Sequence, residues 1–164
     1  MLELAVRYTI SQKINNMKTQ LRILYADNDD ACELLAVTLG ISGIEVKSAD
    51  TVAAAWRLAQ TEPFDLYLLE TRFSDGDGFE LCRRMRKFAT QTPIVFYSCE
   101  AYPIDRQKGL AAGATAYLVK PYFDDLASAV LKIIANTKKS NPKSLPVFGG
   151  VPGGLPKHNQ TKIF

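Results

Sequence analysis

Cysteine, histidine and long apolar runs are all scarce in this chain of 164 residues. Its three cysteines, Cys32, Cys82 and Cys99, are odd in number and widely spaced. This spacing argues against a disulfide framework and against a C-x-x-C metal or redox site, so we interpret each cysteine as a small core residue. The only histidine, His158, lies in a Gly/Pro-rich end of the chain and is a poor candidate for catalysis or metal binding.

The apolar residues do not form a run that suits a membrane. No stretch approaches the roughly 20 continuous apolar residues of a spanning helix. Residues 1–20 also lack the unbroken apolar core and the cleavage site of a signal peptide. We therefore expect a cytoplasmic protein that has no membrane partner.

Positive charge is concentrated at the ends of the chain. The formal net charge is +3, yet residues 138–164 carry five lysines and no acidic residue. The excess of basic residues therefore belongs to the flanks and not to the folded part. A nucleic-acid-binding domain needs basic residues clustered on its folded surface, so nucleic acid is not an expected partner.

The middle of the chain alternates short apolar runs with amphipathic segments. We expect strands at 21–26, 44–49, 65–70, 93–98 and 116–120. We expect helices at 27–40, 51–62, 79–89, 104–112 and 124–137. The first of these helices has Leu34, Leu35 and Leu39 on its predicted inner face. The alternation predicts an α/β fold with a five-stranded, doubly wound parallel sheet.

Three regions follow from this pattern. Residues 21–137 form the predicted domain, residues 1–20 an N-terminal extension, and residues 138–164 a flexible basic tail rich in Pro and Gly. The extension is compatible with a weak helix or an extended arm. It also contains Met17, a second candidate start close to the first strand.

Polar residues occur where four of the predicted strands end: Asp27, Glu70, Ser98 and Lys120. In a doubly wound sheet the functional crevice lies beyond the carboxyl ends of the strands, so these side chains are expected to converge. A lysine that ends a buried strand needs a carboxylate partner, which Asp27 or Glu70 would supply.

An acidic pocket with one internal cation is the simplest description of this end of the sheet. Together with Asp29 and Asp30, the pocket has the hard oxygen ligands that suit Mg²⁺. Asp29 and Asp30 have an alternative role, because both stand where they would cap the first helix.

Residues 21 to about 137 resemble the receiver domain of two-component response regulators. The resemblance rests on "ILYADND", "DLYLLE", "DGDGFELCRRMR", "PIVFYS" and "GLAAGATAYLVKP", which follow one another in the order and spacing of that family. It implies a flavodoxin-like sheet of strand order 2-1-3-4-5. It also implies phosphoryl transfer from a histidine kinase to an aspartate, with Mg²⁺ bound beside it.

The resemblance assigns a role to seven positions. These are an acidic pair at Asp27 and Asn28, the phosphoacceptor at Glu70, the metal-binding backbone carbonyl at Arg72, the switch residues Ser98 and Tyr117, and the conserved lysine at Lys120.

Two of these positions depart from the family's pattern. Asn28 replaces an acid, which leaves Asp27, Glu70 and Lys120 with a formal charge of −1 and weakens the expected affinity for Mg²⁺. Glu70 replaces the aspartate and extends its carboxylate by one methylene, and a misplacement of ~1 Å can slow an in-line reaction ~100-fold. We therefore expect ordinary phosphorylation to be impaired.

Two explanations of Glu70 stay open. In one, the glutamate reproduces part of the reach of a phosphoryl group, pairs with Lys120, and biases Ser98 and Tyr117 toward the activated arrangement. In the other, Glu70 only neutralises Lys120 in a site that has lost its chemistry.

The functional prediction is a stand-alone, non-enzymatic signalling module that binds a protein partner, either a histidine kinase or another signalling protein. The resemblance suggests a recognition face at about residues 104–136, and a homodimer is compatible with it. The first alternative is a working phosphoacceptor that uses Mg²⁺. The second is an enzyme that binds a flavin or another phosphate-containing ligand, which the absence of G-x-G-x-x-G and P-loop motifs disfavours.

Overall fold

The computed structural model describes residues 20–28, 32–121 and 125–140. Most of the predicted N-terminal extension, the candidate caps Asp29 and Asp30, and the tail beyond residue 140 lie outside the described residues.

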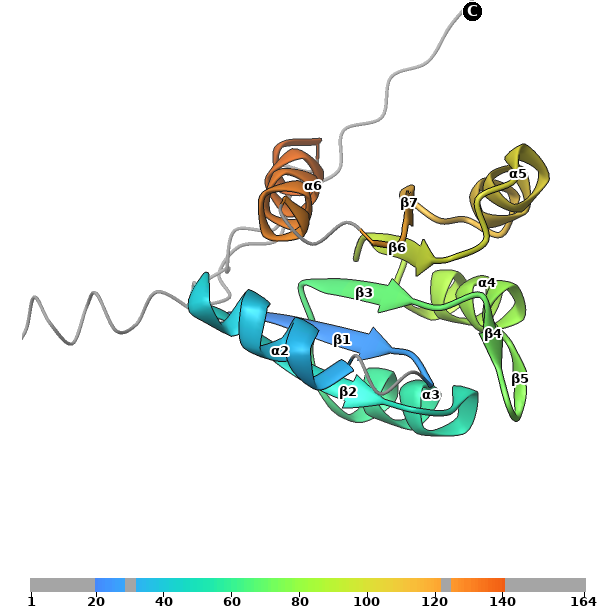
Figure 1. Ribbon diagram of the computed structural model, residues 1–164, viewed down its shortest axis with the longest axis horizontal. Helices are drawn as coiled ribbons and strands as arrows, with labels where there is room; N and C mark the ends of the chain where they lie inside the picture. Colours follow the sequence, from blue (N-terminus) through green and yellow to red (C-terminus); the bar gives the residue numbers. More distant parts are fainter. Residues whose placement is uncertain (1–19, 29–31, 122–124, 141–164) are drawn as a thin grey trace, which may run out of the picture.

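A five-stranded parallel sheet forms the centre of the molecule (Figure 1). Its order is β2-β1-β3-β6-β7, which is the predicted order 2-1-3-4-5 of the five long strands. The strands are β1 (Leu21–Ala26), β2 (Ile44–Ala49), β3 (Leu66–Leu69), β6 (Ile94–Ser98) and β7 (Ala116–Val119). Every residue of β3 and β6 is buried, as expected for strands covered on both faces.

Among the described residues, five helices cover the two faces of the sheet (Figure 1). They are α2 (Cys32–Ile41), α3 (Val52–Thr61), α4 (Gly78–Phe88), α5 (Pro103–Ala111) and α6 (Leu126–Ser140). Residues of α2 and α6 share one core cluster, whereas residues of α3 and α4 share the other. Successive residues of β1 alternate between the clusters, because side chains of a strand point to opposite faces in turn.

A short hairpin after β3 was not predicted. It pairs β4 (Arg72–Phe73) with β5 (Gly76–Asp77), and Ser74 and Asp75 form the turn between these two strands. The carboxylate of Asp75 accepts hydrogen bonds from the first amides of α3, and the carboxylate of Asp77 caps α4. The hairpin therefore ties the loop after Glu70 to two helices.

Gly78 brings that loop close to the sheet. A Cβ atom at this position would lie 2.1 Å from the carbonyl oxygen of Glu70, so only glycine allows α4 to begin so near the end of β3.

Two core predictions were wrong. The side chain of Leu34 is 61% exposed, while Leu35 and Leu39 are buried. Consecutive helix residues point about 100° apart, so Leu34 cannot share the inner face that Leu35 and Leu39 occupy. Cys82 is buried as expected, but Cys99 follows the end of β6 and is exposed.

The helices differ from their predicted ranges mainly at one end. The last helix, α6, continues to Ser140, three residues beyond the predicted boundary at 137, and Lys138 and Lys139 lie in its last turn. Basic residues favour the end of a helix because they complement its dipole. Among the described helices, none is long and apolar enough to cross a bilayer.

Candidate functional site

The polar residues that end the strands meet at the carboxyl edge of the sheet. The ammonium Nζ of Lys120 lies 2.5 Å from Oδ2 of Asp27 and 2.9 Å from Oε2 of Glu70. The side chains of Lys120 and Glu70 are each 12% exposed, and that of Asp27 is 1% exposed. Backbone hydrogen bonds hold the three residues in place, since each amide donates to a carbonyl of the neighbouring strand end. The structure thus places Lys120 between both of its predicted partners.

Thr71, which the sequence did not single out, links Glu70 to the switch position Ser98. The Thr71 amide and hydroxyl both donate to Oε1 of Glu70, at 2.5 and 2.9 Å. The same hydroxyl lies 3.0 Å from Oγ of Ser98. Because the proton of Thr71 points to the carboxylate, the Ser98 hydroxyl must be the donor of this last bond. The result is a chain of hydrogen bonds from Ser98 through Thr71 to Glu70.

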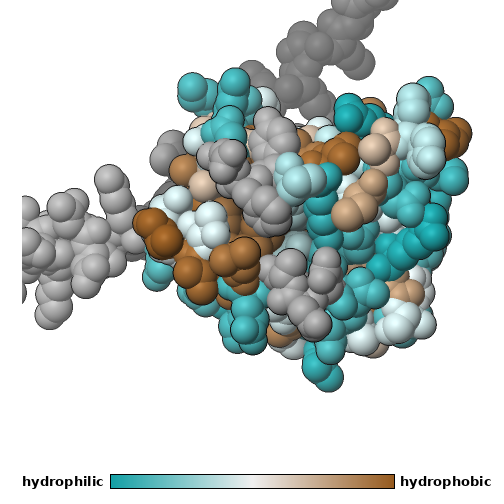
Figure 2. All heavy atoms as spheres, viewed as in Figure 1, coloured by the Kyte–Doolittle hydropathy of each residue, from teal (hydrophilic) through white to brown (hydrophobic). Residues whose placement is uncertain are grey.

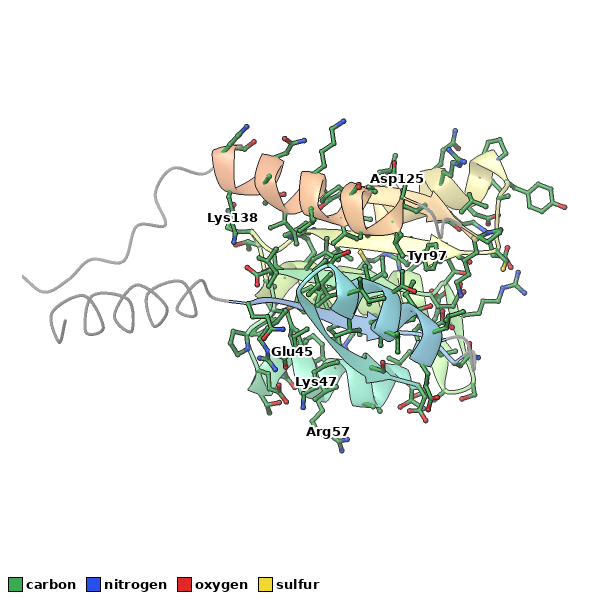
Figure 3. All side chains as sticks on the ribbon, turned by 60° about the vertical axis from the view of Figure 1, so that its left-hand side comes forward. Glu45, Lys47, Arg57, Tyr97, Asp125 and Lys138 are labelled. Carbon is green, nitrogen blue, oxygen red and sulfur yellow. The ribbon has the colours of Figure 1, made fainter. Side chains whose placement is uncertain are left out.

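Tyr25 is a second residue that sequence reasoning missed. Its hydroxyl donates to Oδ2 of Asp27, the same oxygen that receives Lys120. The ring of Tyr25 lies 6.4 Å from that of Tyr97, and Lys120 Nζ lies 5.5 Å from the centre of the Tyr97 ring. Tyr97 belongs to the core cluster beneath α2 and α6 (Figure 3). Tyr25 stands two residues before Asp27, so the period of the strand was the only available signal that both share a face.

The switch positions meet at the backbone of Glu100. The Glu100 amide donates to Oγ of Ser98 at 3.2 Å, and the Tyr117 hydroxyl donates to the Glu100 carbonyl at 2.8 Å. The Tyr117 ring packs 5.7 Å from that of Phe96. The Glu100 carboxylate pairs with the exposed guanidinium of Arg72 at 2.6 Å. One loop residue therefore joins both switch side chains to the hairpin after β3.

The ionic state of the pocket follows from these contacts. Burial raises the pKa of the Glu70 carboxyl, but Ser98, Lys120 and the Thr71 amide outweigh burial and lower the pKa below its ordinary value of 4.5. Burial also lowers the pKa of the Lys120 ammonium, yet hydrogen bonds and charges from the two carboxylates raise it above its ordinary value of 10.5. Glu70 and Lys120 are therefore both charged at neutral pH.

The residues present fit a Mg²⁺ ion poorly. Lys120 occupies one oxygen of Asp27 and one of Glu70, and Thr71 occupies the other oxygen of Glu70. Asn28 is exposed and adds no charge. No group of three His, Cys, Asp or Glu side chains within the described ranges is arranged to hold a metal. The metal roles of Asp27, Asn28, Glu70 and the Arg72 carbonyl stay predictions.

A polar crevice of about 570 Å³ adjoins the site between α4 and α5. Thr71, Arg72, Phe79 and Lys108 are among the residues that line it. Asp105, also in its wall, is 8% exposed, and its Oδ2 has no hydrogen-bond partner within the described part of the chain. The crevice mixes acidic and basic side chains, so it favours neither an anionic nor a cationic ligand.

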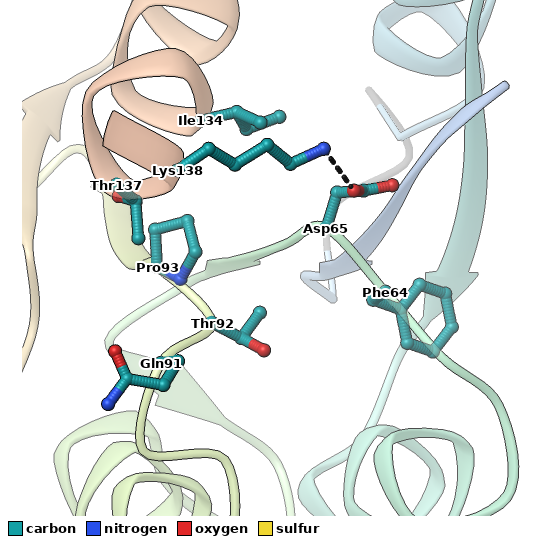
Figure 4. A pocket seen from close by; sticks show the side chains of 8 residues that line it. All are labelled: Phe64, Asp65, Gln91, Thr92, Pro93, Ile134, Thr137 and Lys138. Atoms are coloured by element: carbon teal, nitrogen blue, oxygen red, sulfur yellow. Dashed lines mark hydrogen bonds and ion pairs between the residues drawn. The ribbon is translucent and has the colours of Figure 1, made fainter. Parts of the chain in front are cut away.

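A second hollow lies away from this site, at the other end of β3 and β6 (Figure 4). Its volume is about 210 Å³, below the ~300–1,000 Å³ of typical ligand pockets. Lys138 of α6 pairs with Asp65 there at 3.1 Å, and Phe64, Pro93 and Ile134 supply apolar surface. The two ionisable residues that line the hollow, Asp65 and Lys138, pair with each other, so the lining offers no candidate catalytic group.

Comparison with known families shows to which family this chain belongs. Residues 23–132, well over half of the chain, match the family model of the response regulator receiver domain. The chain belongs to this family. The receiver domain thus accounts for the sheet, the five covering helices and the polar edge described above.

Two curated proteins illustrate the relationship. The response regulator protein PilR of Pseudomonas aeruginosa is 34% identical over 105 residues, which cover 64% of this chain and 24% of PilR. The nisin biosynthesis regulatory protein NisR of Lactococcus lactis is 30% identical over 133 residues, which cover 79% of this chain and 57% of NisR. The chain therefore spans from a quarter to somewhat more than half of these relatives.

Solved receiver structures have the same fold. A CheY-like receiver domain protein from Methanospirillum hungatei aligns with a TM-score of 0.71 and 26% identity, covering 75% of this chain and all of that one. A two-component response regulator from Clostridium difficile aligns with a TM-score of 0.66 and 32% identity, covering 71% of this chain and 97% of that one.

Proposed function

We propose that this receiver domain signals by binding a protein partner and does so without ordinary aspartyl phosphorylation. It acts as a non-enzymatic module of the cytoplasm, and its partner is a histidine kinase or another signalling protein.

One observation carries this proposal: both oxygens of the Glu70 carboxylate are already engaged. Oε2 faces the Lys120 ammonium, and Oε1 accepts two hydrogen bonds from Thr71. A nucleophile for phosphoryl transfer must present a free oxygen in line with the donor. The charge of Glu70 is instead bound by Thr71 and Lys120 within the protein.

The same contacts favour the first explanation of Glu70, in which the glutamate partly mimics a phosphorylated acceptor residue. Thr71 links the Glu70 carboxylate to the Ser98 hydroxyl by hydrogen bonds. The oxygen of this hydroxyl also accepts a hydrogen bond from the Glu100 amide. The hydroxyl of Tyr117 is bound to the Glu100 carbonyl. A network of hydrogen bonds thus connects Glu70, Ser98 and Tyr117 without a phosphoryl group. In this proposal the permanent single charge of Glu70 determines the arrangement of the switch residues.

The partner face is the one formed by α5, β7 and α6. It exposes the apolar side chains of Ile104, Leu110 and Leu131, which are 54%, 55% and 37% exposed. Exposed aliphatic residues on a helix surface suit a protein partner better than a small ligand. A homodimer through this face is one form that the partner could take.

The test compares the wild type with a variant that restores the family's acids. Amide NMR spectra are recorded before and after addition of Mg²⁺ and beryllofluoride, which mimics a phosphoryl group on a receptive carboxylate. The wild type should show no saturable shifts at Ser98, Tyr117 and Lys120. The double variant Asn28→Asp with Glu70→Asp should show them, which proves that the assay can detect a loaded site.

The alternative function is a working phosphoacceptor, favoured by the chain's membership of the receiver family. Saturable shifts in the wild type at the same beryllofluoride concentrations as in the double variant would establish the alternative. Partner binding without phosphorylation would then no longer be the best account of the site.

A further inference from the structure

Helix α2 presents an apolar stripe that nothing in the described chain covers. Leu34, Val37 and Ile41 are 61%, 62% and 84% exposed. Their spacing of three and four residues places them on one face of the helix, opposite the buried Leu35 and Leu39. Hydrophobic atoms gather over this helix, at the left of the view in Figure 2. Three large aliphatic side chains so exposed on one helix face point to an interaction surface.

The chain enters the domain beside the end of this stripe. Leu21, the first residue of β1, pairs with Ile44 of β2, and paired strands lie about 4.8 Å apart. Ile41 precedes Ile44 by three residues, which span at most ~10 Å. The backbone of Ile41 therefore lies within ~15 Å of the point where residues 1–19 join the domain.

Those preceding residues carry a matching pattern in their sequence. Leu2, Val6, Ile10, Ile14 and Met17 follow one another at intervals of four, four, four and three. Such intervals place apolar side chains on one face of a helix, and the intervening positions are mostly polar or basic. A helix of this length is marginal in water by itself, so it needs a surface on which to bury its apolar face.

We infer that residues 1–17 form an amphipathic helix that packs on the apolar stripe of α2 in the same molecule. Three residues, 18–20, connect the two and span up to ~10 Å, enough to let the segment fold back. The contact covers Leu34, Val37 and Ile41.

Hydrogen exchange of the full-length chain tests the contact. Amides of residues 2–17 should be protected in the wild type. Val37→Glu should speed their exchange at least about tenfold, since burial of a valine side chain is worth more than that factor. Ile10→Glu should do the same from the other side of the contact. Both substituted positions lie outside the pocket around Glu70.

Two matched substitutions serve as controls. Leu110→Glu places the same charge on a similarly exposed helix position of α5, and Ser11→Glu places it on the polar face of the segment. Both should leave the protection of residues 2–17 unchanged, because neither position belongs to the contact.

Three results would overturn the inference. The first is exchange of residues 2–17 at the unprotected rate in the wild type. The second is protection that Val37→Glu leaves intact. The third is protection that rises with protein concentration together with a doubled mass, because the stripe is then covered by a second copy. None of these results bears on Glu70, so the proposed function is tested separately.

Discussion

Replacing Glu70 by glutamine tests the charge at the centre of the site while keeping its shape. The amide oxygen of glutamine can still accept the hydrogen bonds of Thr71, but its NH₂ group would face the Lys120 ammonium, where Oε2 now lies at 2.9 Å. One charge-assisted hydrogen bond is lost, worth about 1.5–3 kcal/mol. Lys120 keeps Asp27 as a partner, so the loss stays below the ~3–5 kcal/mol of a lysine left without a counter-ion. We expect Glu70→Gln to lower the free energy of unfolding by about 2 kcal/mol at pH 7.

The pH dependence of this difference is also fixed by the structure. The pKa of Glu70 is lowered in the folded protein, so its charge stabilises the fold above the ordinary value of 4.5. This stabilisation is lost as the pH falls through the folded pKa, where wild-type Glu70 becomes neutral like glutamine. The difference between the two proteins should therefore be full at pH 7 and should shrink below about pH 4.5.

Urea unfolding of both proteins at several pH values measures the difference. Glu80→Gln is the matched control: Glu80 pairs with Arg83 at 2.8 Å, but both side chains are more than half exposed. Surface pairs of this kind contribute about 0–1 kcal/mol, so the control should change stability little. A difference below about 0.5 kcal/mol for Glu70→Gln, or one that does not vary with pH, would refute the reasoning.

Three further predictions concern the same network. Thr71→Val should lower the free energy of unfolding by about 1–3 kcal/mol and shift the amide resonance of Ser98. Thr71→Ser keeps the hydroxyl, so it should leave the stability and the Ser98 resonance unchanged. Equal effects of the two variants would rule out the hydroxyl link. Lys120→Met should cost about 3 kcal/mol at pH 7 in chemical unfolding, because two carboxylates would then face each other. That loss should stay constant to pH 10, since the raised pKa keeps Lys120 charged, and an earlier decline would contradict it. Gly109→Ala should displace the Tyr117 ring, which a Cβ atom would approach to 2.9 Å, and unchanged Tyr117 resonances would refute this.

The sequence by itself determined the fold and the residues that end the strands. Runs such as "LRILYA" and "PIVFYS" are mostly apolar, and the segments between them carry helical periodicity. Together they require a parallel sheet covered on both faces. Because parallel strands end at one edge, the meeting of Asp27, Glu70 and Lys120 also followed from their positions in the chain.

The tertiary structure alone decided which atoms are engaged. Thr71 and Tyr25 look like ordinary strand-end and core residues in the sequence, yet their hydroxyls bind the carboxylates of the site. Whether a hydroxyl reaches a carboxylate depends on side-chain direction and on distances of a few tenths of an ångström, which no periodic pattern encodes. Sequence patterns specify which residues share a strand or helix, while packing specifies which of their atoms touch.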